Sequence, residues 1–246
     1  MSNNSERNWW EFYGVRYAQG TVIGAMIVYF LFSQNENLRK LLFLPSDAKD
    51  FGMAHLTLLA IYGLTYCYIS SAPILVLHAG RALIFKSVIN PAPYNGAVTR
   101  ILFLLTMSLG IPAYLAACGD LNLTQAGGLS TYFLMLLLQL QVVWGILKSR
   151  WNEAISYYIT IINKRKTGDH AEYVESYRHM REHGNSFLIV IFQMLLALPL
   201  YILACAPDID QLVSIRNIFV ILFFWTTPAA FIWVYAIKIE NNLQNL

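Results

Sequence analysis

The feature that most constrains this chain is a series of apolar windows, each close in length to a membrane-spanning helix. A hydrocarbon core about 30 Å thick requires about 20 mostly apolar residues per helix. Hydrophobic residues make up 57% of the 246 and charged residues only 13%, which is outside the range of ordinary globular domains. We therefore predict an all-α polytopic membrane protein with about six transmembrane helices, over residues 17–32, 53–77, 101–118, 129–147, 187–206 and 218–237.

The distribution of positive charge predicts which side of the membrane each loop occupies. Lys and Arg accumulate in short cytoplasmic loops. With six spans and a cytoplasmic N-terminus, the predicted inner segments carry 13 of the 17 Lys and Arg residues and the outer segments carry 4. Both termini are therefore predicted to be cytoplasmic. The expected location is a bacterial inner (plasma) membrane.

One long polar interval, residues 148–186, separates predicted spans four and five. Apolar and aromatic residues recur at three and four positions from Trp144 to Ile162, which predicts a helix running out of span four. Thr167, Gly168 and Asp169 form a turn signal, and a second helix is predicted to follow. The interval is thus predicted to be a cytoplasmic helical hairpin, with a joint at Gly184 and Asn185. The predicted domains are residues 1–147, 148–186 and 187–246.

The hairpin is the predicted contact region for a soluble cytoplasmic protein partner, a ligand or a second copy of the chain. An apolar stripe with aromatic, basic and histidine side chains suits a protein interface. Its charges are mixed, so no nucleic acid is expected. The candidate contact residues are Trp151, Tyr158, Lys164, Arg165, Lys166, Arg178, His179 and His183.

A second candidate surface is a predicted cytoplasmic interfacial helix near residues 78–90. Apolar residues there are interspersed with His78, Arg81 and Lys86. This pattern is typical of an anchor on anionic membrane lipids. The alternative is a ligand or headgroup contact through His78 and Arg81, which are three apart on one helical face.

Small and polar residues within the spans predict how the helices pack. Gly20 and Gly24 form a GxxxG pair, and Gly63 begins another small-residue stripe; such faces let helices approach closely, either within one chain or between subunits. The amides of Gln139, Gln141 and Gln193 are predicted to join helices by hydrogen bonds or to line a polar path.

The sequence offers no set of residues that indicates catalysis or a cofactor. No ionisable residue falls at mid-depth of a span, where a coupled transporter would need one. The string from His179 to His183 has the H-x-x-E-H order of inverted zinc proteases, but its context is unlike theirs. A solvated helix face is the prediction there; the alternative is a weak metal site that also uses His170 and Glu175. We predict no enzyme activity, no metal and no cofactor.

Two functional hypotheses follow. The first is a non-enzymatic, oligomeric membrane protein, acting as a channel, pore-forming effector or membrane sensor and coupled to a soluble partner through the 148–186 hairpin. Small bacterial membrane subunits in antiviral defence or stress systems have a similar architecture, which is an analogy and not a matched motif. The alternative is a facilitative transporter of a small neutral solute that uses Gln139, Gln141 and Gln193.

Overall fold

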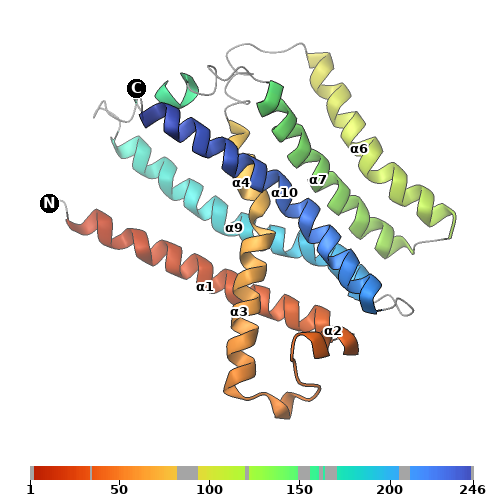
Figure 1. Cartoon of the computed structure of the whole chain (residues 1–246). Helices are drawn as coiled ribbons and strands as arrows, with labels where there is room; N and C mark the ends of the chain where they lie inside the picture. The colour runs from red at the N-terminus through yellow and green to blue at the C-terminus, as the bar shows by residue number, and fades with distance from the viewer. Residues whose placement is uncertain are drawn as a thin grey trace. The chain divides into compact units, whose positions relative to one another are not determined.

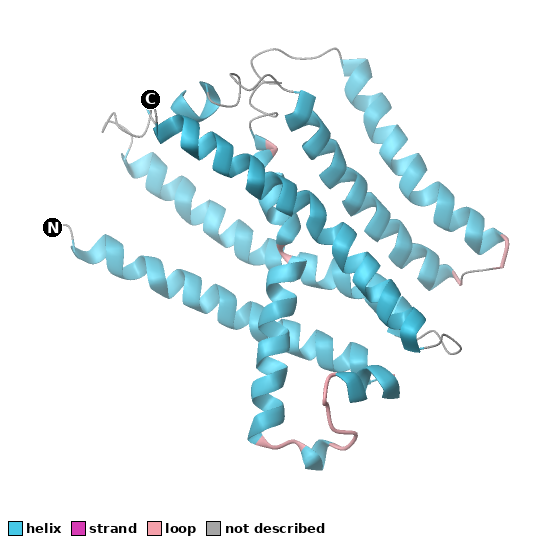
Figure 2. Cartoon of the chain, in the orientation of Figure 1, coloured by secondary structure: helices cyan, strands magenta, loops and turns pink. Residues whose placement is uncertain are grey.

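The computed structural model describes residues 3–33, 35–81, 94–119, 122–148, 156–160, 163, 171–204 and 211–244. Within these ranges every regular element is helical (Figure 2). Five helical segments are long and apolar enough to cross a membrane: Gly14–Ser33, Met53–Ala79, Leu123–Lys148, Gly184–Ile202 and Ile215–Asn241. The third predicted window corresponds to a shorter apolar segment, Leu102–Ala117. The all-α, multi-pass class is therefore confirmed, with five full-length candidate spans.

The chain forms two compact units. Unit 1 comprises Met1–Ser71 and Ser186–Phe223, and unit 2 comprises Ala72–Asn185 and Phe224–Leu246. This division runs across the predicted order of domains because both long C-terminal helices contribute to each unit. These helices are α9 (Ala171–Ala204) and α10 (Gln211–Gln244).

Unit 1 is built on the packing of α1 (Asn3–Ser33) against α3 (Met53–Ser70), two helices that cross in Figure 1. α1 is a single helix that starts well before the predicted window at residue 17, so the residues from Asn3 onward belong to the same helix as the span. Aromatic rings also join the elements of this unit. Tyr17 stacks on Tyr68 with ring centroids 5.0 Å apart, and Phe30 stacks on Tyr201 of α9 at 6.1 Å.

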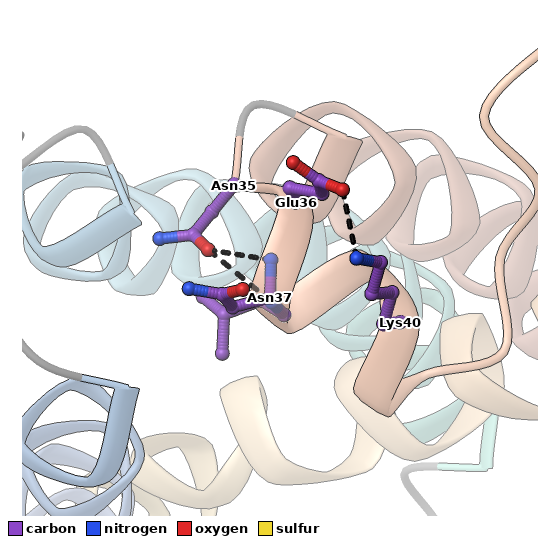
Figure 3. A network of polar contacts seen from close by, with 5 residues as sticks. Asn35, Glu36, Asn37 and Lys40 are labelled. Atoms are coloured by element: carbon purple, nitrogen blue, oxygen red, sulfur yellow. Dashed lines mark hydrogen bonds and ion pairs between the residues drawn. The ribbon is translucent and has the colours of Figure 1, made fainter.

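The loop between α1 and α3 is short and ordered. It contains α2 (Glu36–Leu41), whose N-terminus is capped by Asn35: Oδ1 accepts hydrogen bonds from the backbone N–H of Asn37 and Leu38 (Figure 3). Glu36 Oε1 lies 2.8 Å from Lys40 Nζ, and this ion-paired hydrogen bond lowers the pKa of the Glu36 carboxyl. These contacts stabilise the first and last turns of a six-residue helix.

α2 ends in an unusual C-terminal turn centred on Phe43. The N–H of Leu44 donates to Arg39 O and the N–H of Phe43 donates to Lys40 O, the hydrogen-bond pattern of a Schellman motif. That motif places its central residue in the left-handed region, normally a glycine, yet here Phe43 has φ 54°. Leu38 and Leu44 are both buried beside the turn, which supplies the apolar contact that accompanies this motif.

The second span breaks into α3 and α4 (Ala72–Ala79) at Ser71, two residues before Pro73. Pro73 lies in the first turn of α4, where the missing N–H removes no intrahelical bond. The N–H of Ser71 still donates to Cys67 O, so α3 is closed before the break.

Unit 2 contains α4, α6 (Tyr94–Ala117), α7 (Leu123–Lys148) and residues 224–244 of α10. α6 and α7 form an antiparallel hairpin (Figure 1). The side chains of Asn122 and Gln125 each accept a hydrogen bond from the backbone N–H of the other, at 2.8 and 2.9 Å, and this reciprocal cap starts α7 six residues before the predicted window.

α9 is one uninterrupted helix of 34 residues. The prediction of a joint at Gly184 and Asn185 is wrong, because both residues are helical within it. Helix propensity explains the difference: an isolated glycine in a helix costs about 1 kcal/mol relative to alanine, which neighbouring helix-forming residues outweigh. The polar segment before residue 184 and the apolar span after it consequently belong to one helix.

Candidate functional site

A polar cluster lies at the end of unit 2 that the charge distribution predicts to be cytoplasmic. It begins with His78 in the last turn of α4, whose Nε2 lies 3.0 Å from Oδ1 of Asn185 on α9. A carbonyl oxygen only accepts, so Nε2 carries the proton in this pair. The hydrogen bond ties α4 to α9 at the point where the polar part of α9 becomes apolar.

Arg81 lies one turn beyond His78, and its positive charge acts on Tyr158. Burial raises the pKa of the Tyr158 hydroxyl, the neighbouring Tyr157 raises it further, and the positive charge of Arg81 partly opposes both effects. The rings of Tyr157 and Tyr158 meet edge to face at 5.2 Å. Tyr235 of α10 lies within electrostatic range of Tyr158. We call Arg81, Tyr157, Tyr158 and Tyr235 the Arg81 cluster.

The Arg81 cluster brings together residues that the sequence assigns to two separate surfaces. Arg81 belongs to the predicted interfacial helix and Tyr158 to the predicted hairpin. Of the other predicted contacts, Arg178, His179 and His183 lie on α9 in a stretch whose side chains are not described, so the metal-free reading of the H-x-x-E-H string stays a prediction. Outside the described residues lie Lys86, Trp151, Lys164, Arg165 and Lys166.

The predicted small-residue faces meet inside unit 1. A Cβ added to Gly24 would collide with the carbonyl oxygen of Gly63, and a Cβ added to Gly20 would collide with Cys67 Sγ. The two helix backbones therefore approach to a distance that only glycine allows. Of the two packing modes that the sequence leaves open, the structure has the intramolecular one. By contrast, Gly14 has no described heavy atom within 4 Å of an added Cβ.

Gln193 on α9 joins the same crossing through two hydrogen bonds. Its Nε2 donates to the carbonyl oxygen of Gly20 at 2.7 Å, and its backbone carbonyl accepts from the hydroxyl of Tyr66 at 2.7 Å. A Cβ on Gly24 would lie 3.1 Å from this Nε2, so the glycine also makes room for the amide. Gln193 thus binds α9 to both α1 and α3.

Gln139 on α7 differs sharply from Gln193. Its side chain is fully buried, and neither its Nε2 nor its Oε1 has a hydrogen-bond partner among the described residues. Gln141, two residues on, is only half-buried. The three glutamines that the sequence groups together therefore have three environments, and only Gln193 acts as a hydrogen-bonded link between helices.

One side-chain contact within unit 1 and one within unit 2 could not be predicted from the hydropathy or charge pattern of the sequence. Arg16 is only 8% exposed, and its Nε donates to Ser186 Oγ at 3.0 Å within unit 1. Asn185, the partner of His78 in unit 2, is the preceding residue of α9. Such pairs depend on how helices are aligned along one another, which hydropathy and charge counts do not report.

The fold and these contacts define the class of the protein as an all-α, multi-pass integral membrane protein. No protein-family model, no curated protein and no solved structure matches the chain.

Proposed function

We propose that the chain is a non-enzymatic, oligomeric protein of the bacterial inner membrane that couples a soluble cytoplasmic partner to a channel, pore-forming or sensing activity. The observation that supports it is the continuity of α9. Its first part, from residue 171, belongs to the polar interval, and residues 184–202 are a candidate span. At 1.5 Å per residue the helix is about 50 Å long. In this proposal a displacement of its polar end is passed along the helix to its apolar end.

Two features of unit 2 suit a partner-sensing end. The His78–Asn185 hydrogen bond holds α9 against α4, so a partner that moves α9 must break or strain it. The Arg81 cluster offers tyrosine and arginine side chains, the residue types enriched in the energetically important part of protein interfaces. The polar part of α9, with Arg178, His179 and His183, supplies further contact residues in this proposal.

The test is purification of the full chain with and without a change at the proposed contact end. Gentle extraction followed by native mass measurement should yield more than one copy of the chain together with a soluble protein. Tyr158→Ala and Arg81→Ala should each reduce the amount of that protein that co-purifies. Tyr114→Ala is the matched control, since Tyr114 is exposed on α6, at the opposite predicted side of the membrane. A monomer without any partner contradicts the proposal.

A second experiment tests whether α9 transmits the binding event to its apolar end. Two glycines inserted after Gly184 should leave partner binding intact but stop the partner from changing hydrogen exchange in the 186–202 segment. The same insertion after Leu123, in the first turn of α7, is the control. If the exchange of the segment responds equally in both proteins, α9 does not transmit the binding event.

A further inference from the structure

Unit 2 contains a buried amide whose hydrogen-bonding groups are unused. Gln139 is 0% exposed, and among the described residues neither its donor nor its acceptor has a partner. Leaving a buried polar group unsatisfied costs about 1–3 kcal/mol, and membrane hydrocarbon offers no water to reduce that cost. Gln139 therefore lowers the stability of the fold relative to leucine or methionine, which have a similar size and no polar group to satisfy.

Gln139 lies on the same face of α7 as two residues that make apolar contacts. On α7, Tyr132 and Ile146 lie seven residues to either side of Gln139, and all three are buried. Seven residues are nearly two helical turns, so the three side chains share one face and are spaced about 10 Å apart. Gln139 thus lies midway between the contacts that Tyr132 and Ile146 make.

Both of those contacts involve α10. Tyr132 stacks on Trp225, with ring centroids 6.1 Å apart and planes inclined by 16°. Ile146 packs in an apolar cluster whose other buried members are Val76, Ala229 and Ile232. We call the interface of α7 with residues 224–244 of α10 the α7–α10 seam. Along α7, Gln139 therefore lies between the Tyr132–Trp225 stack, which we call the aromatic plug, and the Ile146 cluster, which we call the aliphatic plug.

The seam has a built-in weak point and no charge. Pro228 lies inside α10 between the two plugs, where it removes one intrahelical hydrogen bond and favours bending. Residues 123–147 of α7 and 224–237 of α10 contain no Asp, Glu, Lys or Arg. A lone amide dipole without ionisable neighbours suits neutral molecules that both donate and accept hydrogen bonds, because an ion would remain uncompensated.

We infer that the α7–α10 seam is a closed path for water and small neutral solutes, with Gln139 as its polar contact and the two plugs as its gates. An apolar constriction excludes water when it is narrow and admits it when it widens. In the closed form the amide has no hydrogen-bond partner among the described residues; widening of the seam hydrates it, which offsets part of the free energy needed to separate the plugs. The inference concerns the chain alone and holds with or without a cytoplasmic partner.

The test measures permeability of vesicles that contain the purified chain. Trp225→Ala removes one side of the aromatic plug and should raise osmotic water permeability, followed by light scattering, several-fold over the parent. Trp233→Ala is the matched control on the same helix, since Trp233 is 61% exposed whereas Trp225 is 0% exposed. Adding Gln139→Leu to Trp225→Ala should abolish the increase. Equal permeability of the Trp225→Ala and Trp233→Ala vesicles, or an increase that survives Gln139→Leu, overturns the inference.

Urea flux distinguishes a path that conducts only water from one that also conducts small neutral solutes. If urea crosses Trp225→Ala vesicles faster than control vesicles, the path conducts small solutes as well as water. If only the water permeability rises, the path conducts water alone, with the same gates and the same contact at Gln139. Water and urea both donate and accept hydrogen bonds, which is what the side-chain amide of Gln139 can bind.

A thiol-accessibility measurement keeps the inference testable if Trp225→Ala does not fold. In a chain with Cys67→Ala, Cys118→Ser and Cys205→Ser, Gln139→Cys should react slowly with a small water-soluble methanethiosulfonate reagent, during the transient openings of the seam that admit water. Leu140→Cys, at a neighbouring exposed position of the same span, should not react, because a thiol in hydrocarbon does not ionise. A cysteine at position 139 that is as unreactive as one at position 140 overturns the inference.

Discussion

Gly63 is the residue whose substitution tests the α1–α3 crossing most directly. A Cβ at this position would collide with the carbonyl oxygen of Thr21 and lie 2.6 Å from the backbone nitrogen and 2.8 Å from the Cβ of Ala25. All three atoms belong to the backbone of α1 or are directly attached to it. No side-chain rotation relieves the overlap, so α1 and α3 must separate.

The expected loss of stability follows from three terms. Overpacking a close contact costs about 1–3 kcal/mol, and a contact with rigid backbone belongs at the upper end of that range. Separation of the helices also weakens the hydrogen bond from Gln193 to Gly20, worth about 0.6 kcal/mol in a membrane protein, while the better helix propensity of alanine returns about 1 kcal/mol. Gly63→Ala should therefore lower the free energy of unfolding by about 2 kcal/mol.

The assay is equilibrium unfolding in mixed micelles by titration with a denaturing detergent, followed by tryptophan fluorescence. Gly14→Ala on α1 is the control: an added Cβ meets no described atom within 4 Å, so this variant should be unchanged or more stable by up to about 1 kcal/mol. Equal stabilities of the two variants would refute the packing argument. A Gly63→Ala chain that keeps its stability but loses its oligomeric state would show that this face joins subunits instead.

Three further substitutions have expected outcomes that the structure determines. Gln193→Leu removes the hydrogen bond to Gly20 and should destabilise the chain by about 0.6 kcal/mol in the same unfolding assay, with no effect if the bond is absent. Phe43→Gly places the residue suited to φ 54° in the turn after α2 and should stabilise the chain by about 1 kcal/mol, measured as a higher detergent midpoint. Arg81→Met removes the charge that lowers the pKa of Tyr158, so this pKa, already raised by burial, should rise further in fluorine NMR of fluorotyrosine-labelled protein. Because the folded pKa exceeds the unfolded one, the stability contributed by Tyr158 is present below the unfolded pKa and is lost as the pH rises through the folded value.

The parts of the fold that depend on local composition could be predicted from the sequence. Apolar windows of about 20 residues require backbone groups to bond within each segment, so helices follow from length and hydropathy alone. The break near Pro73 follows from the missing N–H of that residue. The ordered cap between α1 and α3 follows equally from short-range signals around Asn35 and Pro45.

The ends of the helices were predicted less well, for two different reasons. α7 starts at Leu123 because of the reciprocal cap between Asn122 and Gln125, a pattern that is visible in the sequence as a polar pair three apart. α9 instead runs through Gly184, because a single glycine does not stop a helix whose neighbours favour it. Hydropathy windows report the apolar part of a helix and omit its polar continuation.

The two fully buried glutamines show why a site of this kind cannot be derived from one helix at a time. Both lie in apolar spans, and an amide in such a span is expected to find an interhelical partner. Gln193 does so because glycines on α1 bring a backbone carbonyl within its reach. Gln139 has no such partner among the described residues, although Tyr132 on the same helix stacks on Trp225 of α10. Whether a buried amide finds a hydrogen-bond partner therefore depends on the residues of the facing helix, which cannot be identified from one helix alone.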